Sequence, residues 1–223
     1  VKYYRTDENT PNATISYYTK GSLVALALDL TLRSEGTGTL DEVMRRLWAA
    51  SAGGPISEAD IAAALAAVGG RSYAGELAAW VHGTDELPLQ ALLASAGIDW
   101  QAQAATLAQR LGLRASESAL TGVKVSQVLH GGAAERAGLA AGDELLAVQG
   151  WRVRRLEDAL RLLVPGGVSS WLVARDQRVH TLDLTLPAEG ESEHGVERGA
   201  VALAAAVRPA KAAQAVRRAW LGH

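Results

Sequence analysis

The 223-residue sequence contains no cysteine and no phenylalanine. Without cysteine the chain can form neither a disulfide framework nor a thiolate zinc site. Without phenylalanine, six tryptophans and five tyrosines supply all of its aromatic packing. The missing cysteine does not identify the compartment, and nothing else in the sequence does so.

Strong charge of one sign and long apolar runs are also missing. The net charge is −2, and nothing in the composition indicates the concentrated basic face that binding to nucleic acid or anionic lipid needs. The most apolar segment, residues 23–32, contains Asp29 and is shorter than the ~20 residues of a membrane span. We therefore expect no nucleic acid and no membrane among the partners. Hydrophobic residues make up 48% of the chain, which is enough for a packed core.

The first hundred residues read as helices joined by glycine turns after a polar surface loop over residues 1–20. A nearly continuous apolar segment, residues 21–33, predicts a buried helix. Thr39 and Glu42 have the spacing of a capping box, which predicts a helix from residue 40 that ends before Gly53. Further helices are expected from Ser57, over residues 73–82 and over residues 88–95.

The pattern changes after residue 97. A helix is expected over residues 98–110, followed by short β-rich runs between glycine turns, which predict an α+β module of about 85 residues. Two short helices are expected within it, at residues 133–137 and 156–164. The predicted strands are residues 123–129, 144–148, 168–174 and 179–186. An acidic linker, residues 187–200, then leads to a last helix that follows Pro209 and must dock, because Trp220 is costly to leave in water.

Residues 133–150 carry the most specific motif. Gly138 can end a short helix in the left-handed conformation, Leu139 can fold back onto that helix, and Gly142 can make the next turn. Asp143 can accept hydrogen bonds from turn amides. This string resembles the AGL-x-x-GD-x-L-L-x-x-x-G signature of PDZ domains; an unrelated α+β module with glycine turns is the alternative.

The resemblance implies a module that adds a peptide as an extra strand between a sheet edge and a helix. The loop that holds the terminal carboxylate usually reads x-Φ-G-Φ, where Φ is apolar. Arg110, Leu111, Gly112 and Leu113 fit this pattern in the bacterial arrangement, in which the loop follows a helix. Leu160 is expected to face the groove from the helix at 156–164. Simple core packing of the two leucines is the alternative, and the fold can also serve only as a spacer.

The first half adds a second resemblance. Residues 15–30 and the string from Leu40 to Trp48, with YYTKG and LDEVM within them, resemble the glycyl aminopeptidase family of zinc metallopeptidases. In that family a thermolysin-like catalytic domain precedes a C-terminal PDZ domain. The resemblance implies that residues 1–100 are the helical C-terminal part of a catalytic domain, and that a parent protein releases N-terminal glycine or alanine. The opening residues also read like the interior of a domain, so we expect a fragment.

The family's zinc site is an H-E-x-x-H helix, and this sequence does not contain one. No histidine has a second histidine four residues away, and none is followed by glutamate: they are His82, His130, His180, His194 and His223. The resemblance implies that zinc belongs to the parent protein, that its site precedes Val1, and that this chain alone is inactive and has no cofactor. Tyr18 matches the tyrosine of a Y-x-K-G motif that donates to the oxyanion in related aminopeptidases. Packing of Tyr17 and Tyr18 against the following helix is the alternative.

The sequence thus predicts a multidomain α+β chain. A helical part at residues 1–100 precedes a PDZ-like β-sandwich or barrel with two helices at residues 101–186, and a linker and helix occupy residues 187–223. The expected partner is the C-terminus of a peptide or protein. Two other functions remain open: a non-catalytic peptide-binding adaptor, and a structural module whose groove is filled by the chain's own tail.

Overall fold

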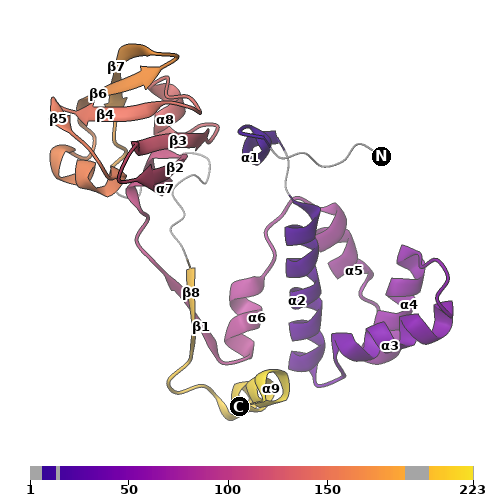
Figure 1. The fold of residues 1–223 in the computed structure, drawn as a ribbon. Helices are drawn as coiled ribbons and strands as arrows, with labels where there is room; N and C mark the ends of the chain where they lie inside the picture. Colours follow the sequence, from indigo (N-terminus) through magenta and orange to yellow (C-terminus); the bar gives the residue numbers. More distant parts are fainter. Residues whose placement is uncertain (1–6, 14–15, 189–200, 223) are drawn as a thin grey trace. The chain divides into compact units, whose positions relative to one another are not determined.

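The computed structural model describes residues 7–13, 16–188 and 201–222, and divides the chain into two compact units (Figure 1). The β-rich unit contains residues 7–13 and 102–188, and the helical unit contains residues 16–101 and 201–222. The predicted α+β class, with a helical half and a β-rich module, is confirmed. Each unit is built from two separate stretches of chain. Most of the expected acidic linker lies outside the described residues.

The helical unit contains three long helices: α2 (Tyr17–Glu35), α3 (Leu40–Ser51) and α4 (Glu58–Gly69). The capping box predicted for α3 is present, since Thr39 Oγ1 accepts from the Glu42 amide at 3.3 Å and Glu42 Oε2 accepts from the Thr39 amide at 2.9 Å. Shorter helical segments follow: α5 (Ala74–Leu77), the π-helix η1 (Ala78–His82) and α6 (Leu89–Ser95). Of the helices described, none is both long and apolar enough to cross a membrane.

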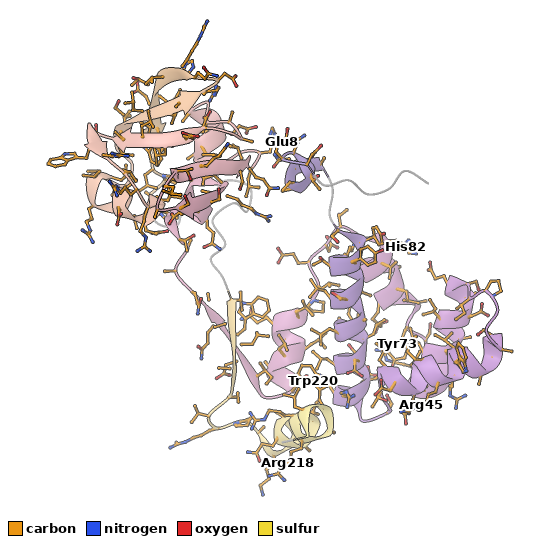
Figure 2. The ribbon with its side chains drawn as sticks, in the orientation of Figure 1. Glu8, Arg45, Tyr73, His82, Arg218 and Trp220 are labelled. Carbon is orange, nitrogen blue, oxygen red and sulfur yellow. The ribbon has the colours of Figure 1, made fainter. Side chains whose placement is uncertain are left out.

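α2 is apolar on nearly every face because it is covered on two sides. Leu28 and Leu32 belong to one buried cluster with residues of α3 and α4, whereas Leu30 belongs to a second cluster with residues of α6. The C-terminal helix α9 (Lys211–Leu221) packs on this second cluster through Val216 and Trp220 (Figure 2). The predicted tail helix therefore finds its apolar partners within the helical unit. A helix that is buried on both sides has no single apolar stripe.

The helix predicted over residues 98–110 is wrong. Its first part is strand β1 (Ile98–Ala102), which pairs with strand β8 (Val201–Ala205) in a two-stranded sheet. Only its end is helical, as α7 (Leu107–Leu111). The partner of β1 lies about a hundred residues further along the chain, so the local pattern carries no trace of the pairing.

The β-rich unit contains an antiparallel sheet in the order β2-β3-β4-β6-β7, with the two-residue strand β5 on β4. All four predicted strands are confirmed, and β2 and β5 are added. The short helices predicted at residues 133–137 and 156–164 are present as α8 (Ala133–Arg136) and the 3₁₀ helix η2 (Leu156–Leu162). The strands are β2 (Leu113–Ser118), β3 (Gly122–Val128), β4 (Glu144–Val148), β5 (Trp151–Arg152), β6 (Val168–Arg175) and β7 (Arg178–Thr185).

The turn before β4 forms as its sequence predicts. Gly138 and Gly142 have φ of 81° and 97°, and Leu139 is buried in the unit's core. Asp143 is fully buried and accepts from the Ala140 amide at 2.9 Å. Arg175 at the end of β6 completes this arrangement by donating to both Asp143 oxygens at 2.7 Å. The bonded Asp143 carboxylate raises the pKa of the Arg175 guanidinium.

Residues 7–13 are part of the β-rich unit and contain a short helix, α1 (Thr10–Ala13), where the sequence predicts only a loop. The Asn12 side-chain amide lies against the end of β3. Its Nδ2 donates to the Val128 carbonyl at 2.8 Å, and its Oδ1 accepts from the His130 amide at 2.8 Å. One side chain thus satisfies the two peptide groups as a neighbouring strand would.

Replacing Arg175 by methionine should destabilise the β-rich unit by roughly 2–4 kcal/mol, because it leaves the buried Asp143 carboxylate without its cationic partner. The free energy of unfolding, measured by urea titration, checks this. Arg178→Met is the matched control, since Arg178 is an exposed arginine on the next strand. Equal stability of the two variants would contradict the role assigned to Arg175.

Candidate peptide-binding groove

Strand β2 ends the sheet, and within the described residues no strand pairs with its outer side. The Gly112 carbonyl accepts from the Leu129 amide at 2.7 Å, so it points towards β3. Peptide groups alternate in direction along an antiparallel strand. The N–H and C=O of Leu113 therefore point away from β3, and the N–H and C=O of Ala115, two residues later, point the same way. We call this side of β2, with its free backbone groups at Leu113 and Ala115, the open edge. Free backbone groups in this arrangement can accept an added strand.

The helix η2 is held close to this strand by a carboxylate. Glu117 on β2 accepts from the Leu156 amide through Oε1 at 2.8 Å, which satisfies an amide at the start of η2. A second carboxylate, on Glu157 of η2, accepts from the Leu107 amide at the start of α7 at 2.9 Å. The two contacts fix η2 against β2 and α7. The open edge is therefore bordered by a helix, as addition of a peptide strand between edge and helix requires.

Gly112 shapes the loop that precedes β2. Its φ is 71°, a left-handed conformation that favours glycine, and its amide donates to the Ala108 and Gln109 carbonyls to cap α7. Both of its backbone groups are consequently used inside the unit. Leu113 is the first residue of the predicted loop whose backbone amide faces outwards. A direct part for the Gly112 amide in binding a carboxylate stays a prediction.

The other predicted peptide-binding residues differ in exposure. Leu111 and Leu113 are buried in the main core of the β-rich unit, which matches the core-packing alternative. Arg110 donates through Nη2 to the Pro187 carbonyl at 2.9 Å and so ties α7 to the chain after β7. Leu160 follows the buried Ala159 on η2 and is 37% exposed, so a ligand can contact it. Binding roles for these side chains stay predictions.

Tyr18 lies in the first turn of α2, in the helical unit, and is 71% exposed. Its ring centroid is 4.2 Å from that of Tyr17, and Tyr17 is exposed as well. Lys20 of the same motif has a structural contact, because its Nζ donates to the Gly83 carbonyl at 2.9 Å. In the described part of the chain, no group of three acidic or histidine side chains is placed to hold a metal ion.

Comparison with known proteins agrees with this geometry. The family model described as a PDZ domain matches residues 124–175. An aminopeptidase N family protein from Idiomarina loihiensis matches with a TM-score of 0.78 and 26% identity, over 97% of this chain and 38% of that protein. No curated protein matches the chain.

Two proteases give weaker structural matches. The HtrA-type protease AlgW, solved with a decapeptide, has a TM-score of 0.28 and 28% identity over 41% of this chain and 28% of that one. A serine endoprotease from Yersinia pestis has a TM-score of 0.30 and 23% identity over 35% of this chain and 28% of that one.

The chain therefore contains a PDZ domain within the β-rich unit, matched over residues 124–175. Over nearly its whole length it is similar to an aminopeptidase N family protein, of which it spans little more than a third. The predicted resemblance to a peptidase with a PDZ domain is thus confirmed at this level.

Sequence reasoning missed Glu117 and Glu157, the carboxylates that position η2. Their backbone partners lie 39 and 50 residues away along the chain, so no spacing rule connects them. Only the position of Glu117 at an alternating site of β2, on the same face as buried Leu113, points towards η2.

Glu117→Ala should speed hydrogen exchange at the Leu156 amide by about fivefold, because a net hydrogen bond of about 1 kcal/mol is lost. Glu117→Gln is the matched control, since its side-chain oxygen can still accept from that amide. Hydrogen–deuterium exchange resolved to single residues makes the measurement. If the two variants exchange at the same rate, the carboxylate does not fix the start of η2.

Proposed function

We propose that the PDZ domain of this chain binds the C-terminal end of a peptide or protein along the open edge of β2. The observation that carries the proposal is the outward-facing peptide group of Leu113, directly after the Gly112 turn and beside η2. A strand added there forms ladder hydrogen bonds with Leu113 and Ala115 without displacing any bond of the sheet. The residues around it can contact both the terminal carboxylate and the last side chain of the ligand.

The terminal carboxylate belongs at the start of β2 in this proposal. The Leu113 amide can donate to it, and the guanidinium of Arg110 contributes positive charge nearby while one of its nitrogens bonds Pro187. The last side chain of the ligand then lies towards Leu160, the exposed leucine of η2. Backbone pairing supplies affinity for any sequence, and this apolar contact favours an apolar terminal residue.

Leu160→Glu should weaken binding of a peptide with an apolar C-terminal residue by at least about tenfold, because a buried leucine contact is worth ~1.5–3 kcal/mol. Fluorescence anisotropy with the whole chain and a labelled C-terminal peptide library measures the change. Val179→Glu is the control, since Val179 is an exposed apolar residue of β7 at the other end of the sheet.

An amidated peptide is the second arm of that experiment. Amidation removes the terminal charge, so an amidated ligand should bind less tightly than the same sequence with a free carboxylate. Equal affinity for both forms would show that the groove does not read the chain terminus. Absence of binding across the library would remove the proposal itself.

We also propose that a longer parent protein is a zinc aminopeptidase that releases N-terminal glycine or alanine, with Tyr18 as its oxyanion donor. Support comes from the YYTKG and LDEVM motifs and from the similarity to the Idiomarina loihiensis protein over 97% of this chain. The described residues here do not fit a zinc site, so the zinc ligands would be upstream residues of the parent. Tyr18 suits its role because its phenol is exposed at the first turn of a helix that is firmly packed further along.

In the full-length parent protein, Tyr18→Phe should lower kcat by about 10²–10³-fold and change KM only a few-fold, since a donor to a developing oxyanion acts mainly in the transition state. Steady-state hydrolysis of a glycyl or alanyl substrate provides both constants. Tyr17→Phe removes the adjacent hydroxyl and should keep kcat within about twofold. Equal kcat values for the Tyr18 variant and the natural protein would exclude Tyr18 from catalysis.

The non-catalytic adaptor remains the alternative, and the same two experiments separate it. It requires peptide binding by the PDZ domain and no hydrolysis by the parent protein. The structural alternative, with the tail in the groove, loses support because α9 uses Val216 and Trp220 in the core of the helical unit.

A further inference from the structure

A hollow of about 370 Å³ lies where β2 ends and η2 begins. Its lining consists of Glu117, Ser118, Ala119, Arg154 and Arg155. The first three follow directly from the open edge, and the two arginines precede η2. The hollow is therefore the end of the proposed peptide groove that lies furthest from Gly112.

The charges around this hollow are unequal. The Glu117 carboxylate is bound on both sides, by the Leu156 amide through Oε1 and by Arg155, whose Nε lies 3.8 Å from Oε2. Arg154 is exposed, and among the described residues it has no carboxylate partner. Two guanidinium groups thus face one carboxylate that is already engaged. The lining has a net charge of +1 and at least one arginine available to a ligand.

The position of the hollow fixes which ligand residue would reach it. An added antiparallel strand with its carboxylate beside Leu113 runs along β2 towards Ser118, and paired strands advance together at ~3.3 Å per residue. Ser118 is five residues beyond Leu113. The ligand residue beside the hollow therefore lies four or five positions before the C-terminus.

We infer that this hollow is a selectivity subsite that takes an acidic side chain four or five residues upstream of the ligand's C-terminus. A carboxylate matches the planar donor fork of arginine, and Arg154 and Arg155 approach from the helix side of the groove. The inference rests on the proposed peptide binding and makes it more specific, because it names a charge that the ligand carries at a fixed distance from its end.

The experiment uses the whole chain and a series of labelled eight-residue peptides with one apolar C-terminal residue. A single aspartate is moved through the upstream positions, with alanine and lysine versions at each. Aspartate at the fourth or fifth position upstream should strengthen binding about two- to fivefold over alanine, as expected for exposed ion pairs, and lysine should weaken it. The preference should shrink between 50 mM and 300 mM NaCl, because the pairs are screened.

Protein variants then locate the subsite. Arg154→Gln should reduce the aspartate preference, and the double variant Arg154→Gln, Arg155→Gln should abolish it, while affinity for the alanine peptide stays within about twofold. Arg178→Gln removes one positive charge from β7 and should leave the preference unchanged. Arg154 has no described partner and lies outside the core, so that single variant keeps the fold intact if the double variant does not.

The outcomes distinguish this inference from the proposed function. If no peptide binds, the proposed function fails. If peptides bind but aspartate, alanine and lysine versions bind equally, only the acidic subsite is overturned. A preference for lysine at that position would also overturn it, and would assign the hollow to Glu117 instead. A preference for aspartate that survives in the double variant would place the selectivity elsewhere.

Discussion

The hydrogen bond from the Leu129 amide to the Gly112 carbonyl determines which way β2 presents its backbone. It turns Gly112 inwards, so the alternation of an antiparallel strand turns Leu113 outwards. A shift by one residue would direct the Leu113 peptide group into the sheet and its buried side chain into water. Pairing at the open edge and packing of the core therefore depend on the same register of β2 against β3. Burial of the Leu113 side chain fixes this register and so keeps the Leu113 backbone groups facing outwards.

The end of β3 and the residues directly after it also bind residues 7–13 through the Asn12 side chain. The Leu129 amide bonds the Gly112 loop on one side, while the Val128 carbonyl and the His130 amide bond Asn12 on the other. Residues 7–13 are consequently held against the β-rich unit by hydrogen bonds to the end of β3. The Asn12 side chain holds these residues in place because it makes the two backbone hydrogen bonds that a neighbouring strand would make.

The sequence predicted what local chemistry dictates. The capping box at Thr39 and the turn around Gly138 and Asp143 formed as their residues imply, because all partners lie within a few positions. Partners distant along the chain were missed: the pairing of β1 with β8, the Glu117 contact with η2, and the Asn12 contact with β3. For residues 98–102, a strand with a remote partner was interpreted as helix, since the interaction that decides between the two was not local.

For the candidate site, the motif predicted a turn at Gly112 directly before the open-edge strand, but not the hydrogen bonds that each residue of the loop makes. Gly112 is needed for its φ of 71°, and its amide caps α7. One guanidinium nitrogen of Arg110 donates a hydrogen bond to the Pro187 carbonyl. The sequence could identify residues typical of a PDZ loop, whereas the direction of each peptide group depends on the ladder with β3. That direction is what distinguishes Leu113 from its neighbours.

An open strand edge that must accept a ligand is also an edge on which another copy of the chain could pair. The composition of β2 allows it to bind a ligand and still disfavours pairing with another copy of the chain. Its exposed positions are polar or charged, with Arg114, Ser116, Glu117 and Ser118 beside the single buried Leu113. The ladder register with β3 also shifts between Arg114 and Ala115, and such irregularities twist a strand away from flat pairing. The low β propensity that hides β2 from sequence analysis thus follows from its position: an edge that pairs with a peptide but resists sheet-to-sheet association has to be short, polar and irregular.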